Sequence, residues 1–397
     1  MQSNASPQSR LGMIVALGAL TAFAPLSIDM YLPAFPALEG YFATDAGAVQ
    51  ATLAAFFIGL AIGQAFHGPL SDRFGRRAPL MAGIAIYIAA SIGAVFAPDI
   101  ETLAALRFIQ AIGGCAGMVI ARAMVRDLFD ERDSAKVFSM LMLVMGLAPI
   151  LAPLAGGQIL ILADWRVIFL VLAGFGALCL FSVTLFLPET LGRERRHRGG
   201  LGSVLRAYGH LLADPGFMGF GVANALLSAG LFSYITGSPF IFITLYGVSP
   251  QDYGLLFSLN AFGLIAASQV NVRLLRYWDG RRILKVAMAV NALAGLVLAG
   301  MALAQPASLF LLMVPLFTTL VSLGFVGANA MAAAMSRAGH HAGAASALLG
   351  VMQFGFGAMA GAAVGLFENG TAGPMGLVMA GLAVAGFTTH RLLAARP

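Results

Sequence analysis

Residues 46–98, AGAVQATLAAFFIGLAIGQAFHGPLSDRFGRRAPLMAGIAIYIAASIGAVFAP, hold two uncharged stretches, 46–71 and 78–98, joined by a short charged segment. A helix that crosses a bilayer needs about 20 mostly apolar residues. Each stretch is long enough for one membrane span. This part of the chain therefore predicts two consecutive transmembrane helices with a tight basic turn between them.

The same alternation continues along the chain. Further uncharged stretches of span length are residues 11–28, 137–163, 167–188, 253–272, 338–367 and 369–390. The remaining four spans come from 102–122, from 215–251, and from 286–336, which is long enough for two helices with a turn at Gln305-Pro306. A composition that is 59% hydrophobic and 10% charged excludes a soluble globular protein. We expect an all-α polytopic membrane protein with twelve transmembrane helices.

Basic residues fix the expected orientation. All but two of the 23 Lys and Arg residues lie in the terminal tails or in alternate gaps between spans; the exceptions are Arg107, inside a span, and Arg166, at an outer helix start. Because basic residues near span ends stay on the cytoplasmic side, both termini are predicted to be cytoplasmic. The net charge of +6 then indicates contact with anionic membrane lipids and no nucleic-acid partner.

Two further features limit the class of protein. The only cysteines, Cys115 and Cys179, lie in different spans, which predicts neither a disulfide framework nor a metal site. Residues 11–28 form an apolar segment longer than a signal-peptide core, which we interpret as an uncleaved first helix. We expect no cofactor.

The chain divides almost in half at its most polar stretch, LGRERRHRGG at residues 191–200. We expect an N-terminal six-helix bundle (1–190), a basic cytoplasmic linker (191–213) and a C-terminal six-helix bundle (214–397). Gly75-Arg76-Arg77 recurs 205 residues later as Gly280-Arg281-Arg282. Two pseudo-symmetric bundles with a site at their interface are a transporter layout. The repeat is imperfect, because Arg107 corresponds to Leu312.

The segment after the second span, Gly68-Pro-Leu-Ser-Asp72-Arg73-Phe-Gly75-Arg76-Arg77, is the strongest motif. A solvated loop explains the arginines but not the spacing of the glycines and the aspartate. The segment resembles the signature loop of the major facilitator superfamily. The resemblance implies a conformational lock between two bundles on the cytoplasmic side, made of Gly68, Asp72, Arg73, Gly75, Arg76, Arg77 and, near the end of the fourth span, Arg126.

Arg107 lies in Leu106-Arg107-Phe-Ile-Gln110-Ala-Ile-Gly113-Gly114. A lone arginine inside a membrane helix costs roughly 2.5 kcal/mol or more unless it faces a polar cavity or a partner. The segment resembles the fourth-span motif of the superfamily, which implies a role in proton transfer. The alternative is an arginine that snorkels to the nearby outer interface.

The fifth span carries a third motif, Gly146-Leu-Ala-Pro149-Ile-Leu-Ala-Pro153-Leu-Ala-Gly156-Gly157. It resembles the antiporter motif of the superfamily, except that Ala152 replaces a glycine. Small residues permit close helix packing, and the prolines bend the helix. A bend beside the bundle interface would limit proton leak; the alternative is a kinked packing helix with no bearing on direction.

Asp29, in Ser27-Ile-Asp29-Met-Tyr31-Leu-Pro33-Ala-Phe-Pro36, is expected at the outer end of the first span. An isolated carboxylate in an apolar helix suits a proton carrier; the alternative is a structural carboxylate at the outer interface. This segment, Tyr234-Ile-Thr-Gly-Ser-Pro-Phe-Ile and Pro188-Glu189-Thr190 resemble the bicyclomycin-resistance/chloramphenicol-efflux branch of the superfamily. We expect Arg107 to lie near Asp29 and to bias its protonation; if the arginine approaches Asp29 only in one conformation, proton release becomes coupled to the conformational cycle.

Other polar residues in the spans either line a substrate cavity or join helices by hydrogen bonds. The cavity candidates are Tyr31, Gln110, Asn224, Tyr234, Asn260 and Gln353. We assign no role to His67, His340 or His341.

The motifs together predict a monomeric, multi-pass protein of the bacterial inner membrane. It would export amphipathic drugs by proton-coupled antiport and alternating access, with small-molecule drugs, protons and lipids as its partners. An enzyme is disfavoured, because the spans hold no cluster of nucleophiles, metal ligands or paired acids; no feature favours a signalling or structural protein. The main alternative is a superfamily proton symporter that imports a small metabolite.

Overall fold

The computed structural model describes the chain except residues 1–6, 193, 195–200, 340–341 and 395–397, and every regular element in the described part is helical. The N-terminal half contains α1 (Pro7–Thr21), α2 (Phe23–Asp29), the 3-10 helix η1 (Leu32–Ala34), α3 (Phe35–Phe42), α4 (Ala46–Phe74), α5 (Arg77–Val95), α6 (Ile100–Leu128), α7 (Glu131–Leu162) and α8 (Arg166–Phe186). The C-terminal half contains α9 (Leu201–Ala213), α10 (Pro215–Pro239), the π-helix η3 (Phe240–Leu245), α11 (Pro250–Leu274), α12 (Gly280–Ala304), α13 (Leu309–Met335), α14 (Ala342–Leu366), α15 (Gly373–Thr389) and the π-helix η5 (His390–Ala394).

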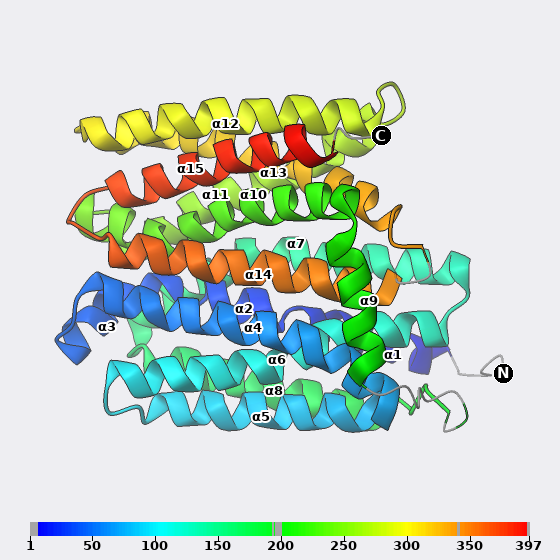
Figure 1. The fold of residues 1–397 in the computed structure, drawn as a ribbon. Coiled ribbons are helices and arrows are strands. Elements are labelled where there is room, and N and C mark those ends of the chain that lie inside the picture. The colour runs from blue at the N-terminus through cyan, green and yellow to red at the C-terminus, as the bar shows by residue number, and fades with distance from the viewer. Residues whose placement is uncertain (1–6, 193, 195–200, 340–341, 395–397) are drawn as a thin grey trace.

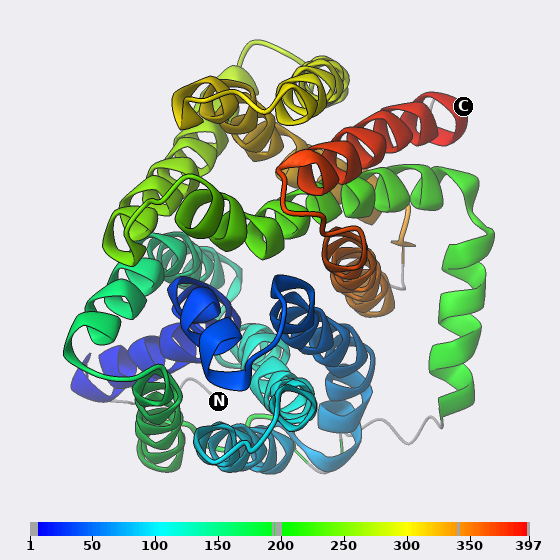
Figure 2. The same cartoon turned by 90° about the vertical axis from the view of Figure 1, so that its left-hand side faces the viewer.

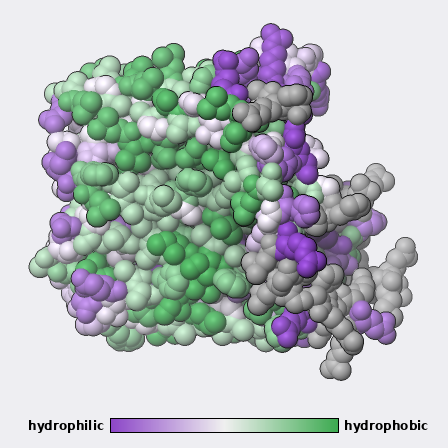
Figure 3. Space-filling model, viewed as in Figure 1, coloured by the Kyte–Doolittle hydropathy of each residue, from purple (hydrophilic) through white to green (hydrophobic). Residues whose placement is uncertain are grey.

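In the described residues, 11 helices are long and apolar enough to cross a membrane, and a pair bent by 42°, α1 with α2 and α3, supplies one more. The predicted twelve spans are confirmed, with the first one broken. The surface of the molecule is also that of a membrane-spanning protein, since an apolar belt lies between two more polar ends (Figure 3). Helix α9 lies across the end at which α1 begins and α15 ends (Figure 1).

The first span differs from its prediction. The chain was expected to leave the helix after residue 28, with Asp29 at the outer end, but helical structure continues to Phe42. Two prolines explain the breaks, because proline has no N–H for the carbonyl four residues earlier and its ring collides with that carbonyl. Pro25 thus ends α1 at Thr21, and Pro33 ends α2 at Asp29. Asp29 therefore lies at a break within the span.

Short turns with unusual backbone conformations connect consecutive spans. Helix α4 continues to Phe74, so most of the signature segment is helical and only Gly75 and Arg76 separate α4 from α5. Gly75 adopts a φ of 93°, a conformation that glycine tolerates and L side chains rarely adopt. The predicted turn at Gln305 is confirmed, since Gln305 adopts a φ of 48° there.

The helices gather in two groups, α1–α8 and α10–α15, which face one another (Figure 2). Helices α4 and α14 form one side of the contact between the groups, and α7 and α11 form the other. Polar bonds cross the second contact: the Ser258 hydroxyl donates to the backbone oxygen of Ile150 at 2.7 Å, and Gln251 Nε2 donates to that of Gly157 at 3.2 Å. The interface between the two groups is therefore lined on this side by α7 and α11.

Helices α5 and α6 approach one another closely at Gly113. A Cβ added at Gly113 in α6 would lie 2.5 Å from the backbone oxygen of Gly83 and 2.6 Å from the backbone nitrogen of Tyr87, both in α5. We expect Gly113→Ala to destabilise the protein by about 1–3 kcal/mol, because backbone cannot move aside easily. Thermal unfolding in detergent measures the effect.

The matched control is Gly300→Ala in α12, where nothing lies within 4 Å of an added Cβ. Alanine is favoured over glycine in a helix by about 1 kcal/mol at both sites. Equal unfolding temperatures for the two variants would contradict close α5–α6 contact.

Candidate functional site

Asp29 is the carboxylate that the fold buries most completely at the interface between the two groups. Its residue is 3% exposed, and among the residues whose burial the structure describes, no other Asp or Glu falls in the buried class. Within that part of the chain, no side chain forms a hydrogen bond or ion pair with it. The 3-10 helix η1, which begins three residues after Asp29, packs against α10 and α11. Asp29 therefore lies close to the segment that reaches the C-terminal bundle.

Arg107 lies wholly inside the N-terminal bundle and is 0% exposed. Its Nη1 donates to Gln110 Oε1 at 2.5 Å, and its Nη2 donates to the backbone oxygen of Ser27 at 2.8 Å. Its guanidinium also lies 4.2 Å from the ring centre of Phe56 and 4.6 Å from that of Tyr31. Full burial among neutral partners rules out the alternative of a snorkelling arginine.

In this conformation, the Arg107 guanidinium is bonded to the backbone of α2 and not to the Asp29 carboxylate. The last carbonyls of a helix have no partner within it. Since α2 ends at Asp29, the carbonyl of Ser27 is one of these, and Arg107 satisfies it. Arg107 thus acts on the segment that carries Asp29.

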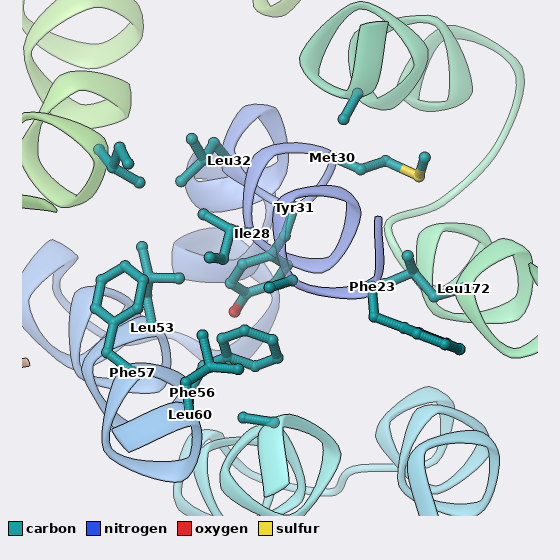
Figure 4. Close-up of a cluster of buried hydrophobic side chains, with 14 of the residues drawn as sticks. Phe23, Ile28, Met30, Tyr31, Leu32, Leu53, Phe56, Phe57, Leu60 and Leu172 are labelled. Atoms are coloured by element: carbon teal, nitrogen blue, oxygen red, sulfur yellow. The ribbon is translucent and has the colours of Figure 1, made fainter. Parts of the chain in front are cut away.

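Two predicted cavity residues, Tyr31 and Gln110, lie in this same buried network. The Tyr31 hydroxyl shares a hydrogen bond of 2.8 Å with Thr52, and Gln110 Nε2 donates to the Ser91 hydroxyl at 2.7 Å. Figure 4 shows the Tyr31 ring beside Phe56, among the apolar side chains of α2 and α4. Both residues are at most 1% exposed, so here they surround Arg107 and do not line an open cavity.

The other cavity candidates lie in the C-terminal bundle. Asn260 Nδ2 donates to the Tyr234 hydroxyl at 3.0 Å, and the Tyr234 ring stacks on Phe257 with centres 5.3 Å apart. The buried Asn224 Oδ1 has no partner among the described residues, and Gln353 is half-buried. These positions are the candidates for contact with a ligand.

The signature segment gathers its charges around Arg76. Arg76 Nη1 donates to Asp72 Oδ1 at 2.5 Å, and its Nε donates to Asp127 Oδ2 at 2.9 Å. The backbone nitrogen of Arg76 donates to Glu189 Oε1 at 2.8 Å, and the Thr190 hydroxyl donates to Asp127 at 2.9 Å. Burial lowers the pKa of Arg76, but the bonds to Asp127 and Asp72 outweigh it and leave the pKa raised.

The predicted lock residues are only partly brought together. Asp72 pairs with Arg76 on its own bundle, and the exposed Arg126 forms no bond with it. Arg73 stacks on its neighbour Phe74, Arg77 donates to the Thr184 carbonyl, and Gly68 has open space around it. Sequence reasoning missed Asp127; its signal was an acid directly beside Arg126 in the last turn of the fourth span.

The motif helix α7 packs against α2, which carries Asp29, and against α11 of the C-terminal group. Pro149 and Pro153 lie inside it, as expected. A Cβ at Gly156 would collide with the backbone oxygen of Met30, next to Asp29, and one at Gly157 would lie 2.9 Å from that of Pro250 in α11. Gly146 faces Ile265 of α11. This packing fits both a leak-limiting role and plain helix packing.

Comparison with known proteins gives one consistent result. The family profile described as Major Facilitator Superfamily matches residues 17–362. The chain is 38% identical to the uncharacterized MFS-type transporter YdgK of Bacillus subtilis, over 97% of this chain and 96% of that protein. It is 31% identical to the bicyclomycin resistance protein homolog of Haemophilus influenzae, over 96% of each.

Similarity extends to further proteins. A chloramphenicol resistance protein of Pseudomonas aeruginosa is 30% identical over 72% of this chain and 67% of its own length. Among solved structures, a D-xylose–proton symporter superimposes with a TM-score of 0.74 at 14% identity, over 98% of each chain. At that identity the likeness concerns the fold alone.

The two carboxylates that bind Arg76, Asp72 and Asp127, are expected to contribute differently to the stability of the protein. The side chain of Asp127 is 17% exposed and accepts two hydrogen bonds, whereas that of Asp72 is 51% exposed. We expect Asp127→Asn to destabilise the protein by about 1–3 kcal/mol, and Asp72→Asn by about 0–1 kcal/mol. Thermal unfolding of the two variants in one detergent makes the comparison, and an equal loss would contradict it.

Proposed function

This chain belongs to the Major Facilitator Superfamily, as a transporter and not an enzyme, and we propose that it exports amphipathic drugs or similar small molecules by proton-coupled antiport. Alternating access across the bacterial inner membrane would carry the drug outward and protons inward. The relatives named for bicyclomycin and chloramphenicol resistance support the direction of transport.

The observation that carries the proposal is Asp29, a buried carboxylate at a helix break just before the segment η1, which packs against the opposite bundle. A carboxylate removed from water is costly in its charged form, so its proton occupancy depends strongly on which side of the membrane it can reach. Opening to the acidic outside would favour protonation and drug release. Opening to the cytoplasm would favour proton loss and drug binding.

The lock is a second part of the proposal. Asp72 uses one oxygen for Arg76, and its side chain is half exposed, so its other oxygen is free to accept a bond when α14 approaches. The exposed Arg126 would join the same contact. A bond made in only one conformation shifts the population towards it. We propose that this contact holds the outward-open form.

A proton symporter that imports a metabolite is the alternative to exclude, because a symporter shares this fold. Everted membrane vesicles that acidify their lumen separate the two. An antiporter accumulates labelled chloramphenicol or bicyclomycin inside such vesicles and loses it when nigericin collapses the proton gradient. A symporter shows no such accumulation.

Asp29→Asn tests the proton carrier. We expect gradient-driven accumulation to fall to the level of vesicles without the protein, because the amide cannot take up a proton, while drug binding is partly kept. The matched control is Glu101→Gln, at an exposed first-turn position of α6. Gradient-driven accumulation by Asp29→Asn equal to that of the wild type would refute the assignment.

Asp72→Asn tests the lock. Spin labels at Phe74→Cys and Ala342→Cys, at the end of α4 and the start of α14, report the separation of the bundles there. We expect Asp72→Asn to increase the population with the longer distance, because the outward-open form loses its tie; about 1.4 kcal/mol changes such a ratio tenfold. An unchanged distance distribution would count against the lock.

A further inference from the structure

Helices α12 and α15 border a groove of about 670 Å³ on the side of the C-terminal bundle that is turned away from the N-terminal bundle (Figure 2). Neither the family comparison nor the proposed transport cycle assigns it a role. We infer that this groove binds an anionic phospholipid, with one acyl chain along α15 and the phosphate between Lys285 and Arg391. The inference is independent of the direction and the coupling of transport.

The walls of the groove suit a hydrocarbon chain. On α15 and η5 they extend from Leu377 to Leu392, and on α12 they include Leu296; none of the lining residues is charged. At 1.5 Å of rise per residue, the run from Leu377 to Leu392 extends roughly 22 Å, whereas one leaflet of the hydrocarbon core is roughly 15 Å thick. An acyl chain that enters from one membrane surface therefore fits along the groove.

The groove forms because α12 and α15 touch along one part of their length and separate along the rest. An added Cβ would lie 2.7 Å from Ala302 Cβ at Gly376, and 3.3 Å from Ala380 Cα at Gly295, so the helices are in close contact there. Further along α15, Gly386 packs closely against α10, and η5 also packs against α10. Figure 2 shows α15 leading away from α12 towards the C-terminal end. The groove is therefore open at the end where α12 begins and η5 lies.

Two exposed cations lie at this open end, one on each side of the groove. Continuing the antiparallel register of the two glycine contacts places Lys285 of α12 level with Arg391 of η5. Because about three helical turns separate Lys285 from the groove-lining Leu296, both side chains project from the same face of α12. Lys285 and Arg391 also both interact electrostatically with the buried imidazole of His390. A phosphate at the open end would therefore lie between two positive charges.

The protein itself does not neutralise these charges. Neither Lys285 nor Arg391 forms an ion pair with a described residue. Asp279 is engaged as the N-cap of α12, where it accepts a bond from the backbone nitrogen of Arg281 at 3.2 Å. Arg281 and Arg282 precede Lys285 by about one turn and lie on the same side of α12. Figure 3 shows hydrophilic side chains gathered at this end, beside an apolar surface. The pattern matches a phosphate headgroup attached to an acyl chain.

A second groove on α12 lacks the charges and serves as a comparison. It has a volume of about 410 Å³ and lies between residues Val290–Met301 of α12 and Leu311–Thr318 of α13. Its lining is also uncharged, and the connection beside it, residues 305–308, carries no charge either. Both grooves can hold hydrocarbon, but charge complementarity to an anionic headgroup is found at the α12–α15 groove.

Binding of phosphatidylglycerol and of phosphatidylcholine with identical acyl chains tests the site. Delipidated protein in detergent is titrated with one lipid or the other, and native mass spectrometry measures the dissociation constant of the first lipid bound. We expect phosphatidylglycerol to bind about 10–30-fold more tightly, because each of the two cations near the headgroup contributes about fivefold.

Lys285→Gln and Arg391→Gln each remove one charge from the headgroup position. We expect each variant to bind phosphatidylglycerol about fivefold more weakly and phosphatidylcholine as the wild type does. The matched control is Arg206→Gln, which removes an exposed charge in α9 and should leave both affinities unchanged.

Gly381→Phe tests the position of the acyl chain. Gly381 lines the groove, and nothing lies within 4 Å of an added Cβ, so the ring would fill the groove without displacing the protein. We expect phosphatidylglycerol to bind about tenfold more weakly, the factor that roughly two buried methylene groups contribute. The matched control is Gly300→Phe, at an equally open position of α12 that lines neither groove.

Three results would overturn the inference. The first is equal affinity of the wild type for the two lipids, or wild-type affinity for phosphatidylglycerol in both charge variants. The second is wild-type affinity in Gly381→Phe, because the acyl chain would then lie elsewhere. The third is a wild-type dimer that Gly381→Phe separates into monomers, because a second copy of the chain would then occupy the groove.

Discussion

A guanidinium without an acidic partner lies at the centre of the N-terminal bundle, and much of the local structure follows from the need to satisfy it. A charge inside a membrane helix costs roughly 2.5–3.5 kcal/mol on insertion scales. Arg107 offsets this with Gln110, with aromatic faces and with the carbonyl of Ser27. That carbonyl is free only because α2 ends at Asp29. The charge and the broken helix therefore stabilise each other.

This dependence changes how Arg107 and Asp29 are coupled. The sequence predicts that the two charges meet; the structure links them through two residues of backbone, from Ser27 to Asp29. Arg107 then positions the helix end, and within the described residues no side-chain hydrogen bond or ion pair holds the Asp29 carboxylate. Gly156 of α7 packs closely against the backbone of Met30, the residue that follows Asp29. The location of Asp29 is thus set by contacts to the backbone on either side of it, at Ser27 and Met30.

The spans, the turns at Gly75 and Gln305 and the overall fold follow from the sequence, because charge-free length and backbone conformation are local properties. The positions of Tyr31 and Gln110 do not. In a water-soluble helix an apolar stripe marks the inner face, but here lipid and helix neighbours are equally apolar, so the pattern of hydropathy does not say which face is turned inward. The role of Asp127 was not predicted for a related reason. Adjacent residues on a helix point in different directions, so the exposed Arg126 gives no indication of where the Asp127 side chain lies.

The asymmetry of charge between the bundles suits an exchanger. Arg107 and Asp29 belong to the N-terminal bundle, and the position equivalent to Arg107 is the buried Leu312. Apart from His390 at the end of the last span, the buried hydrogen-bonding side chains described in the C-terminal bundle are neutral hydroxyls and amides. Under the proposed exchange, a proton bound at Asp29 would change the charge on one side of the interface only. The neutral side would respond by remaking hydrogen bonds, without the movement of a second ion, and its amides and hydroxyls would remain available to drugs of varied shape.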